Sequence, residues 1–216
     1  MSDRLTERQI TDAGNPAKPT GVYGARMLHR MNRSHADVTN WALDFIDFSN
    51  VAHALDIGCG GGATMARLLA RMGGRDGTVC GVDHSEISCE ESRALNAEAI
   101  AAGRAEVLQA DVESLPFADG SFDVAVTVES FYFWPRPQED LVEVARVLAP
   151  GAHFLLVADV YQKDGLPAET LENIRKRNLT VLAPDEYEAS LTRAGLSSVT
   201  VHLRDGTTWI AVEGVR

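Results

Sequence analysis

The sequence predicts an α/β fold: a doubly wound, mostly parallel seven-stranded sheet with helices on both faces, an antiparallel C-terminal hairpin strand and an N-terminal helical cap. Between residues 52 and 159, short apolar runs alternate with helical segments, as in a sheet whose parallel strands are joined by helices. These runs are apolar at consecutive positions, which indicates strands buried on both faces. Near the C-terminus, Asp205-Gly206 lies between two alternating runs and predicts a hairpin.

The chain is predicted to have three parts. Residues 1–20 are polar, contain Gly14, Pro16 and Pro19, and are expected to form a flexible or loosely docked arm. Residues 21–48 show helical periodicity in two pieces and are predicted to form the cap. Residues 49–216 are predicted to form the sheet domain, and the 216 residues leave no room for a second full domain.

Within the sheet domain, each element follows from its own pattern of apolar residues and chain breakers. Strands are predicted over 52–57, 78–82, 105–109, 122–128, 154–159, 198–203 and 207–212. Helices are predicted over 63–72, 85–102, 138–148, 168–178 and 184–194. The first of these helices is expected to stop at Gly73-Gly74, and the third at Pro150-Gly151.

The first strand runs into a glycine-rich turn. Gly58, Gly60 and Ala63 fit the pattern G-x-G-x-x-G/A, and Asp83 ends the second strand 20 residues after Ala63. Glycine permits a positive φ and lets a ligand approach the backbone, while the following helix directs its N–H groups into the crevice. A strand-terminal carboxylate at this spacing can accept hydrogen bonds from ribose hydroxyls. The pattern predicts an adenosine-containing ligand and leaves NAD and S-adenosylmethionine (SAM) as alternatives.

Composition narrows the class of partner. The net charge of −11 repels phosphate backbones and anionic lipid surfaces, so neither nucleic acid nor membrane is expected as a partner. The three cysteines include no C-x-x-C pair, which argues against a disulfide framework or a zinc site. With no apolar signal core at the N-terminus, a cytoplasmic location is expected.

Four segments follow one another in a distinctive order: ALDIGCGGG (54–62), VCGVDHS (79–85), QADVESLPFADGSFDVAVTVES (109–130) and RVLAPGAHFLLVAD (146–159). In this order they resemble the motifs of the class I, Rossmann-like SAM-dependent methyltransferases, over about half of the chain. The closest group is the small-molecule branch, methyltransferase type 11, which includes the ubiquinone-biosynthesis type. Asp56 favours this family over NAD-type oxidoreductases, which usually have an apolar residue there.

The resemblance implies a SAM cofactor, S-adenosyl-L-homocysteine as product, no metal, and a small, partly apolar methyl acceptor. It also implies roles for individual residues. The implied cofactor-binding set is Asp56, Gly58, Cys59, Gly60, Asp83, His84, Asp111, Val112 and Glu129. In this scheme Asp56 orders the loop, Asp83 holds the ribose, and Glu129 borders the transferred methyl group.

A substrate pocket is expected between the cap and the loop after the fourth strand. Its predicted residues are Tyr23, Met31, His35, Tyr132, Trp134 and Tyr161. The loop aromatics either line an apolar acceptor site or pack under the cap. His35 and Glu129 are the candidate general bases, since an acceptor hydroxyl, amine or thiol must lose a proton. A SAM-binding sensor or partner subunit without catalysis remains an alternative. A homodimer is the candidate oligomeric state.

Overall fold

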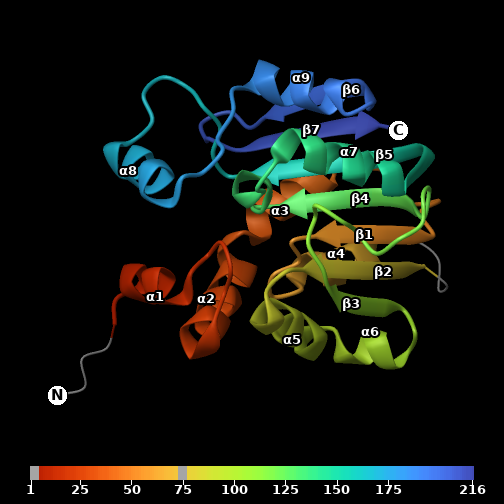
Figure 1. Cartoon of the computed structure of the whole chain (residues 1–216), viewed down its shortest axis with the longest axis horizontal. Coiled ribbons are helices and arrows are strands. Elements are labelled where there is room, and N and C mark those ends of the chain that lie inside the picture. Colours follow the sequence, from red (N-terminus) through yellow and green to blue (C-terminus); the bar gives the residue numbers. More distant parts are fainter. Residues whose placement is uncertain (1–4, 73–76) are drawn as a thin grey trace.

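The computed structural model describes residues 5–72 and 77–216, so the expected stop at Gly73-Gly74 lies outside the described residues. The seven strands are β1 His53–Ile57, β2 Thr78–Asp83, β3 Ala105–Gln109, β4 Phe122–Val128, β5 Leu148–Ala158, β6 Ser197–Leu203 and β7 Ile210–Val215. They form one sheet in the order β3-β2-β1-β4-β5-β7-β6 (Figure 1). β7 pairs antiparallel with both β5 and β6, and the remaining neighbours pair in parallel. The predicted fold class is confirmed.

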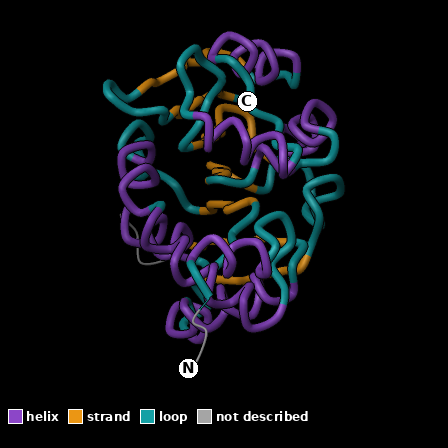
Figure 2. Tube along the Cα trace, turned by 90° about the vertical axis from the view of Figure 1, so that its left-hand side faces the viewer, coloured by secondary structure: helices purple, strands orange, loops and turns teal. Residues whose placement is uncertain are grey.

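The helices are α1 Glu7–Gly14, α2 Gly21–Ser34, α3 Ala36–Leu43, α4 Ala63–Arg71, α5 Glu86–Leu95, α6 Ala97–Ala101, α7 Pro137–Val147, α8 Ala168–Arg177 and α9 Pro184–Arg193, with a 3-10 turn η1 over Phe131–Phe133. Helices cover both faces of the sheet (Figure 2). One face packs apolar side chains of α3, α4 and α5 against the strands, and the other packs those of α7 and α9. The inner strands β1, β2, β4, β5 and β7 are largely buried on both faces for this reason, whereas the edge strands β3 and β6 are partly exposed.

The arm expected over residues 1–20 contains a regular helix, α1. Thr6 and Gln9 form a capping box at its N-terminus, and Ile10 is buried. Arg30 of α2 donates hydrogen bonds to Glu7 and to the hydroxyl of Thr11, so α1 is fastened to the cap. A polar sequence with prolines at its end therefore still forms a helix that packs on its neighbour.

Three element boundaries differ from the prediction, each for a local reason. The helix predicted over 85–102 is divided at Asn96, whose side chain donates to the carbonyls of Ser92 and Gly62. β5 begins at Leu148, because Leu148 pairs with Phe122 ahead of the irregular Pro150-Gly151 segment. The last strand begins at Ile210, since the residues before it form a wider turn in which Thr207 bonds to the carbonyl of Arg204.

The carboxyl ends of the parallel strands lie at one edge of the sheet, where α1 and α2 also lie (Figure 1). In a doubly wound sheet this edge, where the strand order reverses, is where ligands bind. Among the described residues, no helix combines the length and the apolar character needed to cross a membrane.

Candidate functional site

The glycine turn after β1 is held by backbone hydrogen bonds to the end of β2. The N–H groups of Gly58 and Cys59 donate to the carbonyl of Val82 at 2.8 and 3.0 Å. Gly58 has φ +74°, and a Cβ there would lie 2.6 Å from the Cβ of Ser130. Glycine at position 58 is therefore required both by the backbone conformation and by the close approach of the loop after β4.

Asp83 connects this turn to the end of β2. Its carboxylate accepts the N–H of Gly60 at 3.0 Å and the N–H of Ser85 at 2.8 Å. Burial raises the pKa of Asp83, while these two backbone hydrogen bonds act in the opposite direction. Asp83 thus fixes the loop and also lines the cavity beside it.

A cavity of about 430 Å³ lies against the glycine turn. Its sheet side is formed by the turn, Asp83, His84 and the segment after β3 that includes Asp111 and Val112. The opposite side comes from the N-terminal segment, through residues 16–19 and the α2 face that carries Met31. This cavity is large enough for a nucleoside-containing ligand and lies at the switch point of the sheet.

Two hydrogen bonds join the N-terminal segment to the cavity wall. The hydroxyl of Ser85 donates to the carbonyl of Pro19 at 2.6 Å, and the side-chain amide of Asn32 donates to the carbonyl of Gly61 at 2.9 Å. The segment before β1 is therefore a wall of this cavity, and this wall extends back to Pro16.

Asp56 lies under the turn and not in the cavity. It is 1% exposed, and one of its carboxylate oxygens has no hydrogen-bond partner among the described residues. Burial, followed by the neighbouring charge of Asp83, raises the pKa of Asp56 to about 8. The side chain is therefore mainly protonated near neutral pH and can act as a neutral hydrogen-bonding group behind the loop.

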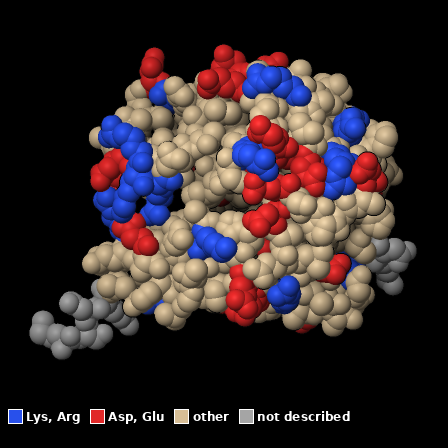
Figure 3. All heavy atoms as spheres, in the orientation of Figure 1, with Lys and Arg blue, Asp and Glu red and all other residues tan. Residues whose placement is uncertain are grey.

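A second cavity, of about 550 Å³, adjoins the first. The residues that line both cavities are Pro16, Met31, His35, Glu129 and Phe133. The outer part of the second cavity lies between α1 and α8, where Lys176 and Arg177 bond to Asp12 of α1 at 2.9 and 2.6 Å. Lys and Arg side chains gather around a hollow on this side of the molecule (Figure 3).

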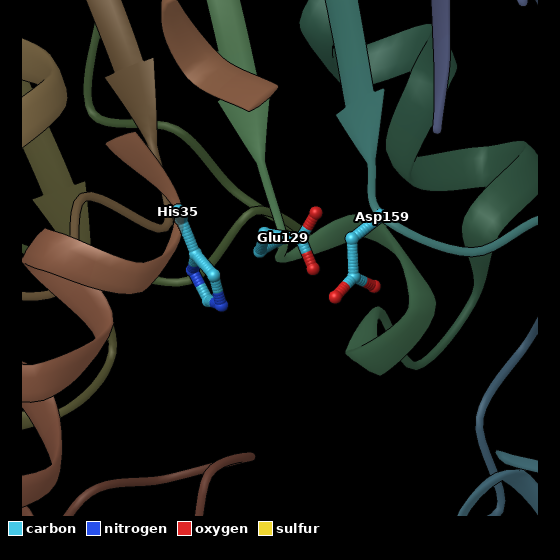
Figure 4. Close-up of side chains that lie close together, drawn as sticks. All are labelled: His35, Glu129 and Asp159. Carbon is cyan, nitrogen blue, oxygen red and sulfur yellow. The ribbon is translucent and has the colours of Figure 1, made fainter. Parts of the chain in front are cut away.

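His35, Glu129 and Asp159 meet where the two cavities join (Figure 4). One potential ligand atom from each of the three side chains lies within 4.8 Å of the other two. His35 stands between α2 and α3, whereas Glu129 follows β4 and Asp159 follows β5. Adjacent parallel strands thus bring the two carboxylates together, and the cap supplies the imidazole.

Glu129 is the buried member of this group. It is 6% exposed and has φ +55°, a conformation that costs energy for a residue with a side chain. Its Oε2 accepts the Tyr132 hydroxyl at 2.8 Å, and its Oε1 has no partner among the described residues. Burial and the nearby Asp159 raise the pKa of Glu129 well above its ordinary value. Burial also lowers the pKa of His35, which favours the neutral imidazole.

The structure brings most of the predicted site residues to the two cavities. Met31, His35, Asp83, His84, Asp111, Val112, Glu129 and Trp134 line the first, together with the turn residues, and Tyr132 lines the second. Tyr23 and Tyr161 line neither cavity. Tyr23 is partly exposed on α2, and Tyr161 is buried in the core on the α7 side of the sheet.

Two polar contributors were not among the predicted site residues. Asp159 directly follows β5, and the sequence signal that could have identified it is an acidic residue at the end of a strand next to the one that Glu129 follows. Asn32 lies one helical turn before His35, but only the structure shows its bond to the glycine turn.

A methyltransferase domain model matches residues 55–156. This chain belongs to the class I SAM-dependent methyltransferase family. The match covers β1 through most of β5, which includes the glycine turn, Asp83 and Glu129. The predicted family and the SAM cofactor are confirmed.

Curated relatives of this chain are named for methyl transfer to different atoms. It is 34% identical over 147 residues to 27-O-demethylrifamycin SV methyltransferase from Amycolatopsis mediterranei, covering 66% of the chain and 53% of that relative. It is 30% identical over 150 residues to sterol 4-C-methyltransferase strm-1 from Caenorhabditis elegans, covering 68% of the chain and 42% of that relative. The chain thus spans about half the length of these relatives or less.

A solved structure has the same fold over nearly its full length. A SAM-dependent methyltransferase from Aquifex aeolicus superposes with a TM-score of 0.65 at 18% identity, covering 98% of each chain.

The residues of the first cavity fit the cofactor. The turn carries no side chain at Gly58 or Gly60, so a ligand can approach its backbone, and Asp83 has its carboxylate at the cavity wall. When bound, SAM supplies an electrophilic methyl group on a sulfonium.

Proposed function

We propose that this protein transfers a methyl group from SAM to a small, partly apolar acceptor. The observation that carries the proposal is the pair of adjoining cavities, which share the wall formed by His35, Glu129 and Phe133. The first would hold SAM, with its ribose at Asp83 and its adenine near His84, Asp111 and Val112. The second would hold the acceptor, so the two ligands would meet at the shared wall.

The chain's own residues would mainly position the two ligands. Methyl transfer needs the acceptor atom in line with the departing sulfur, and holding two reactants in such a geometry lowers the barrier by up to roughly 7–11 kcal/mol. The aromatic segment after β4 would exclude water, since Phe131, Tyr132 and Trp134 are all buried. The second cavity presents Val160, Ile174 and Leu179, against which an apolar part of the acceptor would lie, and its lining also includes the cations Arg8, Arg30, Lys176 and Arg177.

Calorimetric titration with S-adenosylhomocysteine, SAM and NADH tests the cofactor, and transfer of labelled methyl from SAM to a metabolite extract tests the reaction. We expect both sulfur nucleosides to bind, NADH not to bind, and a labelled product to form. Binding without any labelled product would favour a SAM-binding sensor or partner subunit. A protein that is folded but binds neither nucleoside would contradict the proposal.

A further inference from the structure

Two carboxyl groups, those of Glu129 and Asp159, lie together where the two cavities meet, and burial and the nearby Asp159 raise the pKa of Glu129. Asp159 forms no ion pair with any described lysine, arginine or histidine, and neither does Glu129. Glu129 is only 6% exposed, and its Oε1 has no hydrogen-bond partner among the described residues. A buried carboxyl beside a second carboxylate is costly unless a positive group joins them.

We propose that His35, Glu129 and Asp159 form a subsite for the ammonium group of the methyl acceptor, which makes the acceptor an amine. This inference rests on the proposed function and names the acceptor class. The subsite takes the nitrogen at the point where the acceptor cavity meets the cofactor cavity. The apolar part of the acceptor then lies along the second cavity.

The three side chains are close enough together to bind one cation. Three acceptors that each bond a tetrahedral ammonium at about 2.8 Å lie roughly 4.6 Å from one another. Neighbouring ligands of an octahedral metal ion with bonds of about 2.1 Å lie only about 3 Å apart. The observed atoms lie within 4.8 Å of one another, a limit that admits both spacings, so a manganese-binding measurement separates the two cations.

The charged and titratable groups around the subsite have different roles. Glu129 receives the Tyr132 hydroxyl on Oε2 and keeps Oε1 free for the ammonium. Asp159 is exposed at the end of β5 and supplies the second carboxylate. Burial lowers the pKa of His35, the charge of Asp159 acts in the opposite direction, and Arg30 of α2 lowers this pKa further, which favours the neutral imidazole.

The chemical step then balances. The acceptor ammonium gives one proton to His35 and becomes a neutral amine. Its lone pair forms a bond to the methyl carbon as the carbon–sulfur bond breaks and its electron pair goes to sulfur. The products are S-adenosylhomocysteine, which is uncharged at sulfur, and an N-methylammonium, which carries the positive charge that the sulfonium had. The same carboxylates compensate this charge until the product leaves.

The experiment compares probes that differ in one group. Phenethylamine and 2-phenylethanol, and the smaller pair butylamine and 1-butanol, are titrated into the full-length protein with and without saturating S-adenosylhomocysteine. We expect each amine to bind at least tenfold more tightly than its alcohol, because charge-assisted hydrogen bonds to carboxylates are the stronger ones. Asp159→Asn should reduce this preference to threefold or less.

A matched control is Asp164→Asn, which removes another exposed carboxylate five residues further on that lines neither cavity. It should leave the amine preference unchanged. Glu129→Gln, checked for folding by circular dichroism, should also weaken the preference. Labelled methyl from SAM should appear on the amines and not on the alcohols.

Equal affinity for amine and alcohol would overturn the inference, as would a preference that survives Asp159→Asn. Manganese binding at one site per chain, detected by electron paramagnetic resonance and lost in Asp159→Asn, would assign the subsite to a metal ion. The titration with S-adenosylhomocysteine separates the two proposals. If that nucleoside binds and the amines are not preferred, only the amine inference fails, whereas failure of the nucleoside to bind contradicts the proposed function.

Discussion

Replacing Asp83 with asparagine tests the assignment of the first cavity to SAM most directly. Asp83 already accepts two backbone N–H groups, from Gly60 and Ser85. Its remaining lone pairs would accept the ribose hydroxyls. Asparagine retains one uncharged acceptor and replaces the other with an N–H₂ group that opposes a backbone donor.

The expected loss of binding follows from these contacts. Hydrogen bonds to a charged group contribute about 1.5–3 kcal/mol each, so the loss of one and the weakening of another should cost about 2–4 kcal/mol. That corresponds to a roughly 30- to 1,000-fold rise in Kd for SAM and for S-adenosylhomocysteine. The variant should stay folded, since burial already disfavours the charge of Asp83 and removing it relieves that cost.

Isothermal titration calorimetry with both nucleosides measures the effect. Glu86→Gln is the matched control, because Glu86 is an exposed acid three residues further on that does not line the cavity. It should change Kd less than twofold. Unchanged affinity in a folded Asp83→Asn protein would refute the ribose assignment.

Three further outcomes are expected. Gly58→Ala, with φ +74° and a Cβ that collides with Ser130, should lower the free energy of unfolding by about 1–3 kcal/mol in urea melts, and full stability would contradict the tight approach. The raised pKa of Asp56 means that the folded state holds a proton which the unfolded state releases, so the wild type should lose stability as pH rises from about 4 to 8. Asp56→Asn should reduce the slope of the unfolding free energy against pH by up to about 1.4 kcal/mol per pH unit. An unchanged slope would contradict the raised pKa. Asp12→Asn removes the ion-pair partner of Lys176 and Arg177 in α8, a helix with no buried residue. Amide hydrogen exchange should therefore become faster in α8 and stay the same in the sheet. Unaltered exchange in α8 would show that these ion pairs do not stabilise the helix.

The sheet could be predicted because its signals are local. Continuous apolar runs, the glycine turn and the acid at the end of β2 each lie within a few residues, and the order of strands follows from how such units wind. Asn96 and Leu148 were harder to place, because a side-chain bond to a distant loop and a strand pairing across the sheet decide those boundaries.

The candidate site was predictable only where sequence neighbours form it. The turn and Asp83 belong to one strand–helix–strand unit, so their spacing reveals them. Asp159 joins Glu129 through the pairing of β4 with β5, and His35 reaches both from the cap. Tyr23 and Tyr161 are close to site residues in the sequence but do not line either cavity. Tyr23 lies on an exposed part of α2, and Tyr161 is buried in the core on the α7 side of the sheet.

The shared wall of the two cavities has a kinetic consequence. In the proposed arrangement donor and acceptor would occupy adjoining cavities that share Pro16, Met31, His35, Glu129 and Phe133, so neither would have to pass through the space of the other. We therefore expect that either ligand can bind first and that catalysis runs through a ternary complex of random order. In initial-rate experiments the spent nucleoside should compete with SAM but act as a noncompetitive inhibitor toward the acceptor.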